Sequence, residues 1–416
     1  MICERLSLDT KPLKDLVETI FDEVKTRKNQ ALFDYTERFD HCRLDTLTVM
    51  PEEFVQAEAV LGDDLKKSIS IAFDNIYKFH AAQQETSNPI EVMPGVNCWR
   101  KSVPIDRVGF YIPGGSAPLF STVLMLGIPA LIAGCKTKVL CSPPGLDGKI
   151  DPTILYAAAL VGVDKVYKVG GIQAIAAMTL STETIPKVYK IFGPGNQYVM
   201  AAKDYSQSYS VAIDLPAGPS EVLVIADGIC DPAFVAADLL AQAEHGPDSQ
   251  VVLVSTSKDY IDQVQREIER LVPILSRSKV INQSLSTSSF SVLLKDLEEC
   301  MAFANEYAPE HLILAIDHAA YYADQVVNAG SVFVGGYSCE SFGDYASGTN
   351  HTLPTSGYAK AYSGVSLDSF VKKITFQEIT QEGLKLLGPT VMTMAEAEGL
   401  DAHKNAISVR LNLFKD

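Results

Sequence analysis

The feature that most constrains the fold is a regular alternation of short β-branched runs with helical stretches, from about residue 103 to residue 334. Such alternation indicates βαβ units, in which helices cover both faces of a parallel sheet. In the first series the expected strands are 107–112, 137–141, 165–169 and 188–192, and the expected helices are 121–134, 151–161 and 172–180. In the second series the expected strands are 221–226, 250–255, 289–294, 311–316 and 331–334, and the expected helices are 232–244, 259–271, 297–307 and 318–328.

A Pro- and Gly-rich turn at 215–220 (LPAGPS) separates the two series. Helical periodicity precedes them from about residue 9 to 84, and helical pieces follow from Phe376 onward. The sequence therefore predicts an α/β protein with two Rossmann-like parallel-sheet domains and helical N- and C-terminal arms. The expected parts are an N-terminal helical segment that packs on the second α/β domain (1–102), a first α/β domain (103–215), a second α/β domain (216–355) and a C-terminal arm (356–416).

Composition excludes two classes of partner. The chain has 35 Lys and Arg against 51 Asp and Glu, a net charge of −16, and it has no basic stripe for nucleic acid. The longest apolar run, 123–135, is interrupted by Gly127 and Pro129 and is shorter than the ~20 residues of a membrane span. Because the eight cysteines are scattered without a CxxC pair and no secretory signal is evident, we expect a protein of the reducing cytoplasm.

Glycine-rich turns follow three strands of the first series, although the sequence has no GxGxxG motif after a strand. They are the segment 111–116 (YIPGGS), the pair Gly170-Gly171 and the segment 193–195 (GPG). Ligands of open α/β sheets bind at the carboxyl ends of strands, where helix N-termini offer free N–H groups. One such turn can serve a tight connection only, but three in one series favour a phosphate-binding site.

Two pairs of residues in the second series have the spacing for shared chemistry. Gln242 and His245 lie three residues apart at the end of a helix, which places them on one face. This pair is compatible with a metal site, but also with a solvated helix end. Glu310 and His311 begin a strand and could form a general acid–base pair, although the dipeptide alone is weak evidence.

Two further segments contain an acid and a histidine. Asp344 and His351 lie in a Gly-rich loop, and Glu398 and His403 lie near the C-terminus. Each segment alone is compatible with an ordinary surface. Together, a set of Gln242, His245, Asp344 and His403 would form a nitrogen and oxygen shell without thiolate, which suits zinc or manganese.

Seven strings make the sequence resemble the histidinol dehydrogenase family from about residue 10 to the end. They begin at the residues given and read YIPGG (111), FGPGN (192), LPAGPSEVL (215), AQAEHGPDS (241), NEYAPEHL (305), GDYASGTNH (343) and AHKNA (402). The resemblance implies a zinc-dependent, NAD-linked oxidoreductase of histidine biosynthesis. Such an enzyme oxidises L-histidinol through L-histidinal to L-histidine with two NAD⁺.

The resemblance also implies roles for individual residues and a homodimer with shared active sites. One zinc ion per site would be bound by Gln242, His245, Asp344 and His403. The catalytic residues would be His311, as general base, and Glu310, which activates water for the second step. NAD⁺ would contact Tyr111, Gln173 and Asn196. The substrate-binding residues would be Ser220, Gln242, His245, His311, Asp344, His351, Glu398 and His403.

Two other function classes compete with this interpretation. A zinc hydrolase could use Glu310 to activate a metal-bound water without any nucleotide, but it would lack HExxH and would leave the three glycine-rich turns unexplained. A non-catalytic binding relative would keep the fold, but we would expect it to have lost Glu310, His311 or a metal ligand. All of these residues are present.

Overall fold

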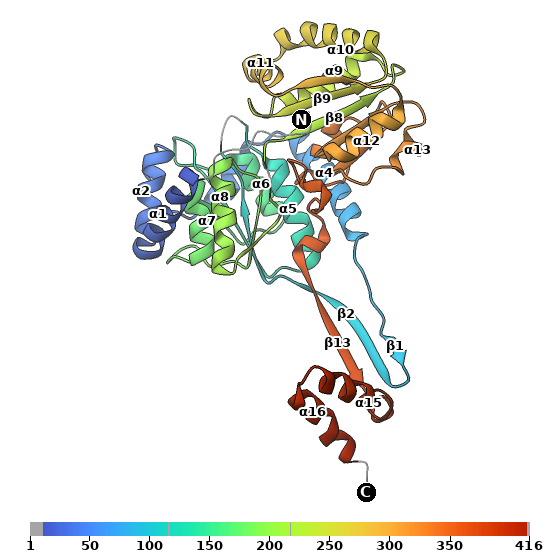
Figure 1. Cartoon of the computed structure of the whole chain (residues 1–416). Coiled ribbons are helices and arrows are strands. Elements are labelled where there is room, and N and C mark those ends of the chain that lie inside the picture. Colours follow the sequence, from blue (N-terminus) through green and yellow to red (C-terminus); the bar gives the residue numbers. More distant parts are fainter. Residues whose placement is uncertain (1–10, 115–116, 217, 414–416) are drawn as a thin grey trace. The chain divides into compact units, whose positions relative to one another are not determined.

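The computed structural model describes residues 11–114, 117–216 and 218–413 (Figure 1). The chain forms two compact units. The first unit contains residues 1–83 and 105–370, and the second contains 84–104 and 371–416. Parts of the expected turns at 111–116 and 215–220 (residues 115, 116 and 217) lie outside the described residues. None of the described helices combines the length and the apolar character that a membrane span requires.

The first unit contains two parallel five-stranded sheets of the same topology, which are visible as arrows in Figure 1. The first sheet has the order β5-β4-β3-β6-β7, and its strands are β3 (Arg107–Tyr111), β4 (Thr137–Ser142), β5 (Lys165–Lys168), β6 (Lys190–Phe192) and β7 (Ala212–Ile213). The second has the order β10-β9-β8-β11-β12, and its strands are β8 (Glu221–Ala226), β9 (Gln250–Ser255), β10 (Phe290–Leu293), β11 (His311–Ala315) and β12 (Ser331–Val334). In both sheets the strand that comes first in the sequence (β3 or β8) lies in the middle, and the direction of the strand order changes beside it, as in Rossmann-like folds. The expected α/β class is confirmed.

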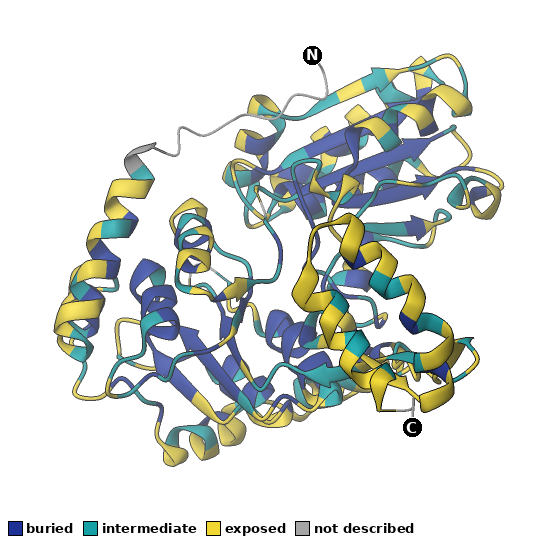
Figure 2. Cartoon of the chain, turned by 60° about the horizontal axis from the view of Figure 1, so that its bottom comes forward, coloured by how far each residue is buried: buried dark blue, intermediate teal, exposed yellow. Residues whose placement is uncertain are grey.

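Helices cover both faces of each sheet, so the central strands are buried, as Figure 2 shows. The edge strands β7, β10 and β12 are partly exposed. Those of the first sheet are α5 (Phe120–Ala133), α6 (Pro152–Leu160), α7 (Gly171–Leu180) and α8 (Gln197–Ser206). Those of the second are α9 (Pro232–Ala243), α10 (Lys258–Leu271), α11 (Ser278–Thr287), α12 (Leu297–Tyr307) and α13 (Ala319–Ala323). Helices α8 and α11 were not expected, and α13 ends five residues earlier than the expected helix 318–328.

The N-terminal helices pack mainly on the first sheet, so the expectation that they pack on the second α/β domain is wrong. They are α1 (Lys11–Arg27), α2 (Asn29–Phe39), α3 (Pro51–Val60) and α4 (Asp63–Ala81). Helix α1 contacts α7 and α8, α2 contacts α7, α3 contacts α6, and α4 contacts α5. The physical reason is that the apolar faces of these helices continue two cores of the first sheet: Val17 and Phe21 join one, and Ile69 and Ile76 join the other.

The second unit is an antiparallel sheet followed by two helices. Its sheet has the order β1-β2-β13, with β1 (Ile90–Met93), β2 (Val96–Pro104) and β13 (Val371–Ile379), and its helices are α15 (Gln381–Ala397) and α16 (Asp401–Asn412). Strand β13 pairs with β2 along nine residues, from Val371 with Pro104 to Ile379 with Val96. The expected helix from Phe376 onward is therefore wrong for 376–379, and residues 84–104 are not part of a helical segment. Because β2 and β13 lie far apart in the sequence, no turn between them predicts that they pair.

Candidate active site

Glu310 and His311 stand at the amino end of β11, the strand between β8 and β12. Helix α12 ends at Tyr307, Ala308 caps it in the left-handed conformation, and Pro309 leads the chain into the strand. Glu310 is 5% exposed and His311 is 3% exposed. Both contact one residue of β8: the backbone N–H of Glu221 donates to Glu310 Oε2 at 2.9 Å, and His311 Nδ1 lies 3.3 Å from the Glu221 carbonyl oxygen. Neighbouring side chains of one strand thus share one buried site.

Burial and neighbouring charges shift the pKa of both groups. Burial raises the pKa of Glu310 to about 7. Burial lowers the pKa of His311, but the carboxylates of Glu340, Glu310 and Asp344 outweigh that effect and raise it to about 10. The Glu310 Oε2 atom lies 3.7 Å from His311 Nδ1, and Asp344 Oδ1 lies 3.6 Å from His311 Nε2. Without an added cation, the His311 imidazole is therefore protonated at neutral pH, and the surrounding carboxylates stabilise its positive charge.

A cluster that can hold a metal ion adjoins this pair. Helix α14 (Glu340–Tyr345) contributes Glu340 and Asp344, and His245 follows the C-terminus of α9. One ligand atom from each of His245, Glu340 and Asp344 lies within 4.8 Å of the others. Gln242, one turn before His245, is completely buried.

The polar atoms of this cluster fit a cation. Both amide atoms of Gln242, both carboxylate oxygens of Glu340 and His311 Nε2 are buried without a hydrogen-bond partner among the described residues. Buried polar groups are rarely left without a partner. Imidazole, carboxylate and amide oxygen are donors that zinc accepts. The cluster therefore has the chemistry and the unused capacity of a metal site.

Sequence reasoning missed Glu340. The residue is 1% exposed and lies at the start of α14, four residues before Asp344, so both carboxylates share one helix face. Burial raises the pKa of Glu340 to about 8. The i,i+4 spacing of Glu340 and Asp344 is the sequence signal that could have found it, because this spacing is typical of two side chains on one helix face.

The other expected substrate residues differ in their surroundings. His351 is enclosed: its Nδ1 lies 2.8 Å from the Asp344 carbonyl oxygen and its Nε2 lies 3.1 Å from Thr122 Oγ1. Burial lowers the pKa of His351, which favours neutral imidazole. Ser220 is half-buried directly before β8.

The remaining two expected substrate-binding residues, Glu398 and His403, belong to the second unit. Glu398 caps the C-terminus of α15, His403 lies in the first turn of α16, and both are exposed. In the first unit the structure brings together Glu310, His311, Asp344, His245 and His351. The membership of Glu398 and His403 in the site stays a prediction.

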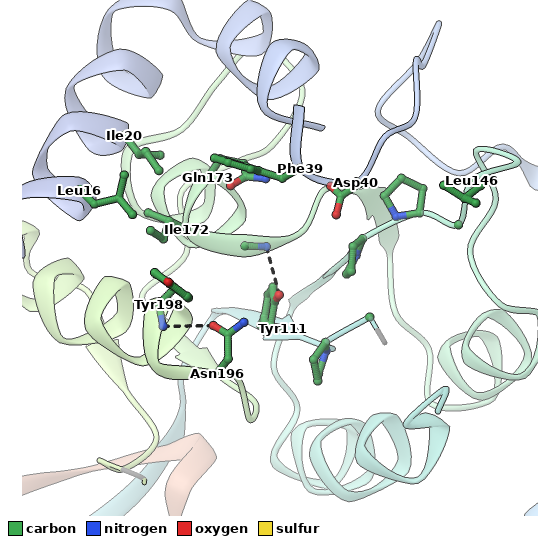
Figure 3. Close-up of a pocket in the computed structure, with 16 residues that line it drawn as sticks. Leu16, Ile20, Phe39, Asp40, Tyr111, Leu146, Ile172, Gln173, Asn196 and Tyr198 are labelled. Carbon is green, nitrogen blue, oxygen red and sulfur yellow. Dashed lines mark hydrogen bonds between the residues drawn. The ribbon is translucent and has the colours of Figure 1, made fainter. Parts of the chain in front are cut away.

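All three expected NAD⁺ residues line one cavity of about 770 Å³ in the first sheet (Figure 3). Tyr111 ends β3, Gln173 lies in the first turn of α7, and Asn196 precedes α8. The cavity is at the carboxyl ends of β3 and β6, where the strand order reverses and ligands of open α/β sheets bind. Gln173 is 1% exposed, and its Oε1 atom has no hydrogen-bond partner among the described residues.

Two helix starts form one side of this cavity. The backbone N–H of Gly171 donates to the Tyr111 hydroxyl at 3.1 Å. Asn196 Oδ1 caps α8 and accepts from the N–H groups of Tyr198 and Val199, at 3.1 and 3.2 Å. Burial raises the pKa of Tyr111 to about 12, so the phenol stays protonated. Helix N-termini and protonated donors attract anions.

A buried ion pair fixes the glycine-rich turn after β6. Lys203 Nζ lies 2.5 Å from Asp214 Oδ1 and donates to the Gly193 carbonyl at 2.8 Å. Asp214 Oδ2 in turn accepts from the Gly193 N–H at 2.8 Å. Gly193 has φ of 120°, and a Cβ atom there would collide with the Tyr111 carbonyl oxygen, so only glycine fits. The pair thus ties the turn before Asn196 to α8, which contains Lys203, and to the end of β7, which Asp214 follows.

The fold and the site define an α/β enzyme with two Rossmann-like sheets, one with a cavity at its carboxyl edge and one with a buried acid–imidazole cluster. Within that class the chain belongs to the histidinol dehydrogenase family, whose model (Histidinol dehydrogenase) matches residues 3–411. The resemblance stated from the sequence is confirmed, and the members of this family are oxidoreductases.

Individual relatives are similar along nearly the whole of this chain. A histidinol dehydrogenase of Bacteroides thetaiotaomicron is 54% identical over 414 residues, covering 100% of this chain and 96% of that protein. A chloroplastic histidinol dehydrogenase of Arabidopsis thaliana is 51% identical, covering 98% of this chain and 87% of that protein. The crystal structure of histidinol dehydrogenase from Elizabethkingia anophelis superposes with a TM-score of 0.98 at 55% identity, covering 100% of this chain and 96% of that chain.

A buried acid next to this site gives a test of pH dependence. Asp238 lies on α9, is 9% exposed, and burial raises its pKa from 3.8 to about 7. A carboxyl with a raised pKa in the folded state binds its proton more tightly there. Stability is therefore lost as pH rises from about 4 through 7. We expect Asp238→Asn to raise the unfolding free energy by about 2–4 kcal/mol at pH 8 and to have little effect at pH 4.

Urea unfolding of metal-free protein at several pH values measures this difference. The matched control is Asp324→Asn, an exposed acid after α13, which should follow the wild-type curve throughout. A constant difference between Asp238→Asn and wild type from pH 4 to pH 8 would show that the carboxyl does not titrate in the folded protein as we expect.

Proposed function

We propose that the chain is a zinc-dependent, NAD-linked histidinol dehydrogenase that oxidises L-histidinol through L-histidinal to L-histidine and reduces two NAD⁺. The observation that carries this proposal is the buried Glu310–His311 pair beside the cluster of His245, Glu340 and Asp344, in a chain of this family. The first α/β domain would bind NAD⁺, and the second would bind zinc and substrate.

The position of His311 suits a general base in both oxidations. Its Nδ1 atom lies next to the Glu221 carbonyl oxygen, so in the neutral ring Nδ1 carries the proton and donates. This leaves Nε2, on the side of Asp344, free to accept the hydroxyl proton of the alcohol while a hydride leaves the same carbon. Oxidation of the hydrated aldehyde requires the same transfer again.

Glu310 suits the hydration of the aldehyde. One of its oxygens is held by the Glu221 N–H, and its pKa of about 7 lets the carboxylate gain and lose a proton near neutral pH. The residue adjoins His311, so it could take a proton from water while the imidazole serves the substrate oxygen. We assign water activation to Glu310 for this reason.

Gln242, His245, Asp344 and His403 would hold the zinc ion, and the unpartnered carboxylate of Glu340 faces the same ligand atoms. When bound, zinc supplies positive charge and a fixed position for the amino and imidazole nitrogens of histidinol. Compensation of the Asp344 and Glu340 charges by a cation would lower the pKa of His311 from about 10 toward neutral. His311 could then act as a base at neutral pH.

NADH formation separates this proposal from its rivals. Zinc-loaded protein mixed with limiting L-histidinol and excess NAD⁺ should yield two NADH per histidinol, together with one histidine. A zinc hydrolase would release no NADH, and a non-catalytic relative would leave histidinol unchanged. Either result would contradict the proposed activity.

Metal removal should separate catalysis from nucleotide binding. The cavity residues Tyr111, Gln173 and Asn196 belong to the first sheet, whereas His245 and Asp344 belong to elements that follow residue 216. Chelation of the metal should therefore abolish turnover, with a loss of at least about 10³-fold, while the dissociation constant for NAD⁺ changes less than about threefold. Calorimetric titration of NAD⁺ into metal-free and zinc-loaded protein, without histidinol, measures the dissociation constant for NAD⁺ in both states.

Readdition of zinc is the control for irreversible damage, and it should restore turnover. Metal-free protein that keeps full activity would contradict a catalytic metal. Metal-free protein that no longer binds NAD⁺ would contradict the separation of the two sites.

We also propose a cytoplasmic homodimer with shared active sites. The described cysteines, seven in number, are all free, as expected of a reducing compartment. Large apolar side chains of α15 and α16 remain exposed, with Met394 at 61% and Val409 at 49%, and helix α16 has no buried residue (Figure 2). An uncovered apolar surface of this kind is typical of an interface. A second copy of the chain is the partner that would complete the zinc site with His403.

A further inference from the structure

The cavity in the first sheet contains one feature that the proposed NAD⁺ residues do not explain. Asp40, which directly follows α2, lines the cavity and is the only charged side chain among the described residues that do so. Its Oδ2 atom is buried and has no hydrogen-bond partner among the described residues. In Figure 3 it lies along the same edge of the cavity as Phe39 and Gln173.

The walls of the cavity indicate which part of a dinucleotide would reach Asp40. The N-terminus of α7, from Gly171 to Gln173, lines the cavity and is the natural anchor for the diphosphate. Apolar side chains from the N-terminal helices, Leu16, Ile20 and Phe39, line the same cavity and offer surfaces for a flat base. Asp40 lies beside Phe39 on the cavity wall, so a base that packs on Phe39 would bring its ribose next to the Asp40 carboxylate.

We propose that Asp40 makes the cavity selective for NAD⁺ over NADP⁺ by accepting a hydrogen bond from the ribose hydroxyl that carries the extra phosphate in NADP⁺. The inference rests on the proposed function, in which this cavity holds NAD⁺. An acid that binds this hydroxyl is the general means by which Rossmann-like folds recognise NAD⁺, and an Arg accommodates the phosphate where NADP⁺ is used. Here the acid is supplied by the segment that follows α2, outside the sheet's own βα units.

Electrostatics explains the rejection of the phosphorylated cofactor. No Lys or Arg is among the described residues that line the cavity, so the phosphate dianion would face a carboxylate without a compensating cation. Burial raises the pKa of Asp40 to about 6, and the only charge that opposes this shift is His41. The carboxyl is thus mostly ionised near neutral pH, and a ribose hydroxyl would supply the donor that the protein lacks.

Two variants separate the charge of Asp40 from its hydrogen bond. Asp40→Asn keeps the shape and an acceptor oxygen but removes the charge. We expect it to bind NADP⁺ about tenfold or more tightly than wild type does, with NAD⁺ binding changed less than about threefold. Asp40→Ala removes the acceptor. Wild type should bind 2′-deoxy-NAD⁺ about tenfold more weakly than NAD⁺, whereas Asp40→Ala should bind the two equally.

Calorimetry with full-length, zinc-loaded protein and no histidinol measures these constants. Asp45→Asn, an exposed acid five residues along the chain, is the matched control and should keep the wild-type ratio of NAD⁺ to NADP⁺ affinity. An unchanged ratio in Asp40→Asn, or an equal loss of 2′-deoxy-NAD⁺ affinity in wild type and Asp40→Ala, would overturn the role of Asp40. Failure of wild type to bind NAD⁺ or to form NADH from histidinol would instead overturn the proposed function.

Discussion

Replacement of His311 with Asn should slow both oxidations, each by about 10²–10⁴-fold, with small changes in NAD⁺ affinity. Asn keeps a donor near the Glu221 carbonyl but has no atom that can accept a proton at the position of Nε2. Because alcohol oxidation and oxidation of the hydrated aldehyde each need a proton acceptor at that position, both should lose the same catalyst. Single-turnover rates with L-histidinol and with L-histidinal measure the two steps separately.

The matched control for this variant is His318→Asn. His318 lies shortly after the same strand, its side chain is 80% exposed, and its backbone is left-handed, a conformation that Asn tolerates well. This control should keep wild-type rates for both substrates. Retention of either oxidation in His311→Asn would contradict the role of His311 as the common base.

Glu310→Gln extends the same experiment to the second residue of the pair. Gln keeps an oxygen that can accept from the Glu221 N–H, but it cannot take a proton from water. Oxidation of histidinal should therefore fall by about 10²-fold or more, and oxidation of histidinol should fall much less. Glu298→Gln, an exposed acid in the first turn of α12, serves as control. Equal losses for both substrates in Glu310→Gln would contradict the division of roles.

The two sheets were predictable from the sequence because the signals for their strands, helices and turns lie within the segments that form them. Strands such as Val222–Ile225 of β8 are continuous apolar runs, and Asp-Pro pairs at 151–152 and 231–232 begin α6 and α9, where the Asp side chains accept from backbone N–H groups. Glycine-rich turns likewise indicated the cavity, since Gly193 occupies a conformation and a space that exclude a side chain. Each of these signals lies within about ten residues of the structure that it predicts.

Features that depend on distant pairing were not predictable in this way. Strand β13 pairs with β2 across more than 260 residues of chain, and its stacked Phe376 and Trp99 rings look unrelated in the sequence. The packing of the N-terminal helices depends on which sheet offers a matching apolar face. Asp40 became a candidate only when the fold brought it to the cavity of Tyr111 and Asn196.

The largest gain in activity should come from mixing two inactive variants. Asp344→Ala removes a proposed ligand in the first unit, and His403→Ala removes one in the second unit. Each variant alone should have almost no turnover, because each proposed zinc site would lack one ligand. If the sites are shared in a two-fold dimer, a mixed dimer would contain one site with both damaged residues and one site with neither.

Random reassortment of equal amounts of the two variants should therefore restore about a quarter of wild-type activity, because half of the dimers are mixed and one of the two sites in each is intact. Distinct affinity tags on the two chains allow mixed dimers to be isolated, and these should reach about half of wild-type activity per dimer. A mixture of Asp344→Ala with Gln242→Ala is the matched control, since both changes affect the first unit and every site in a mixed dimer would keep one damaged residue. If isolated mixed dimers of Asp344→Ala and His403→Ala stay inactive, each chain builds its zinc site from its own His403. The exposed apolar side chains of α15 and α16 would then need another explanation.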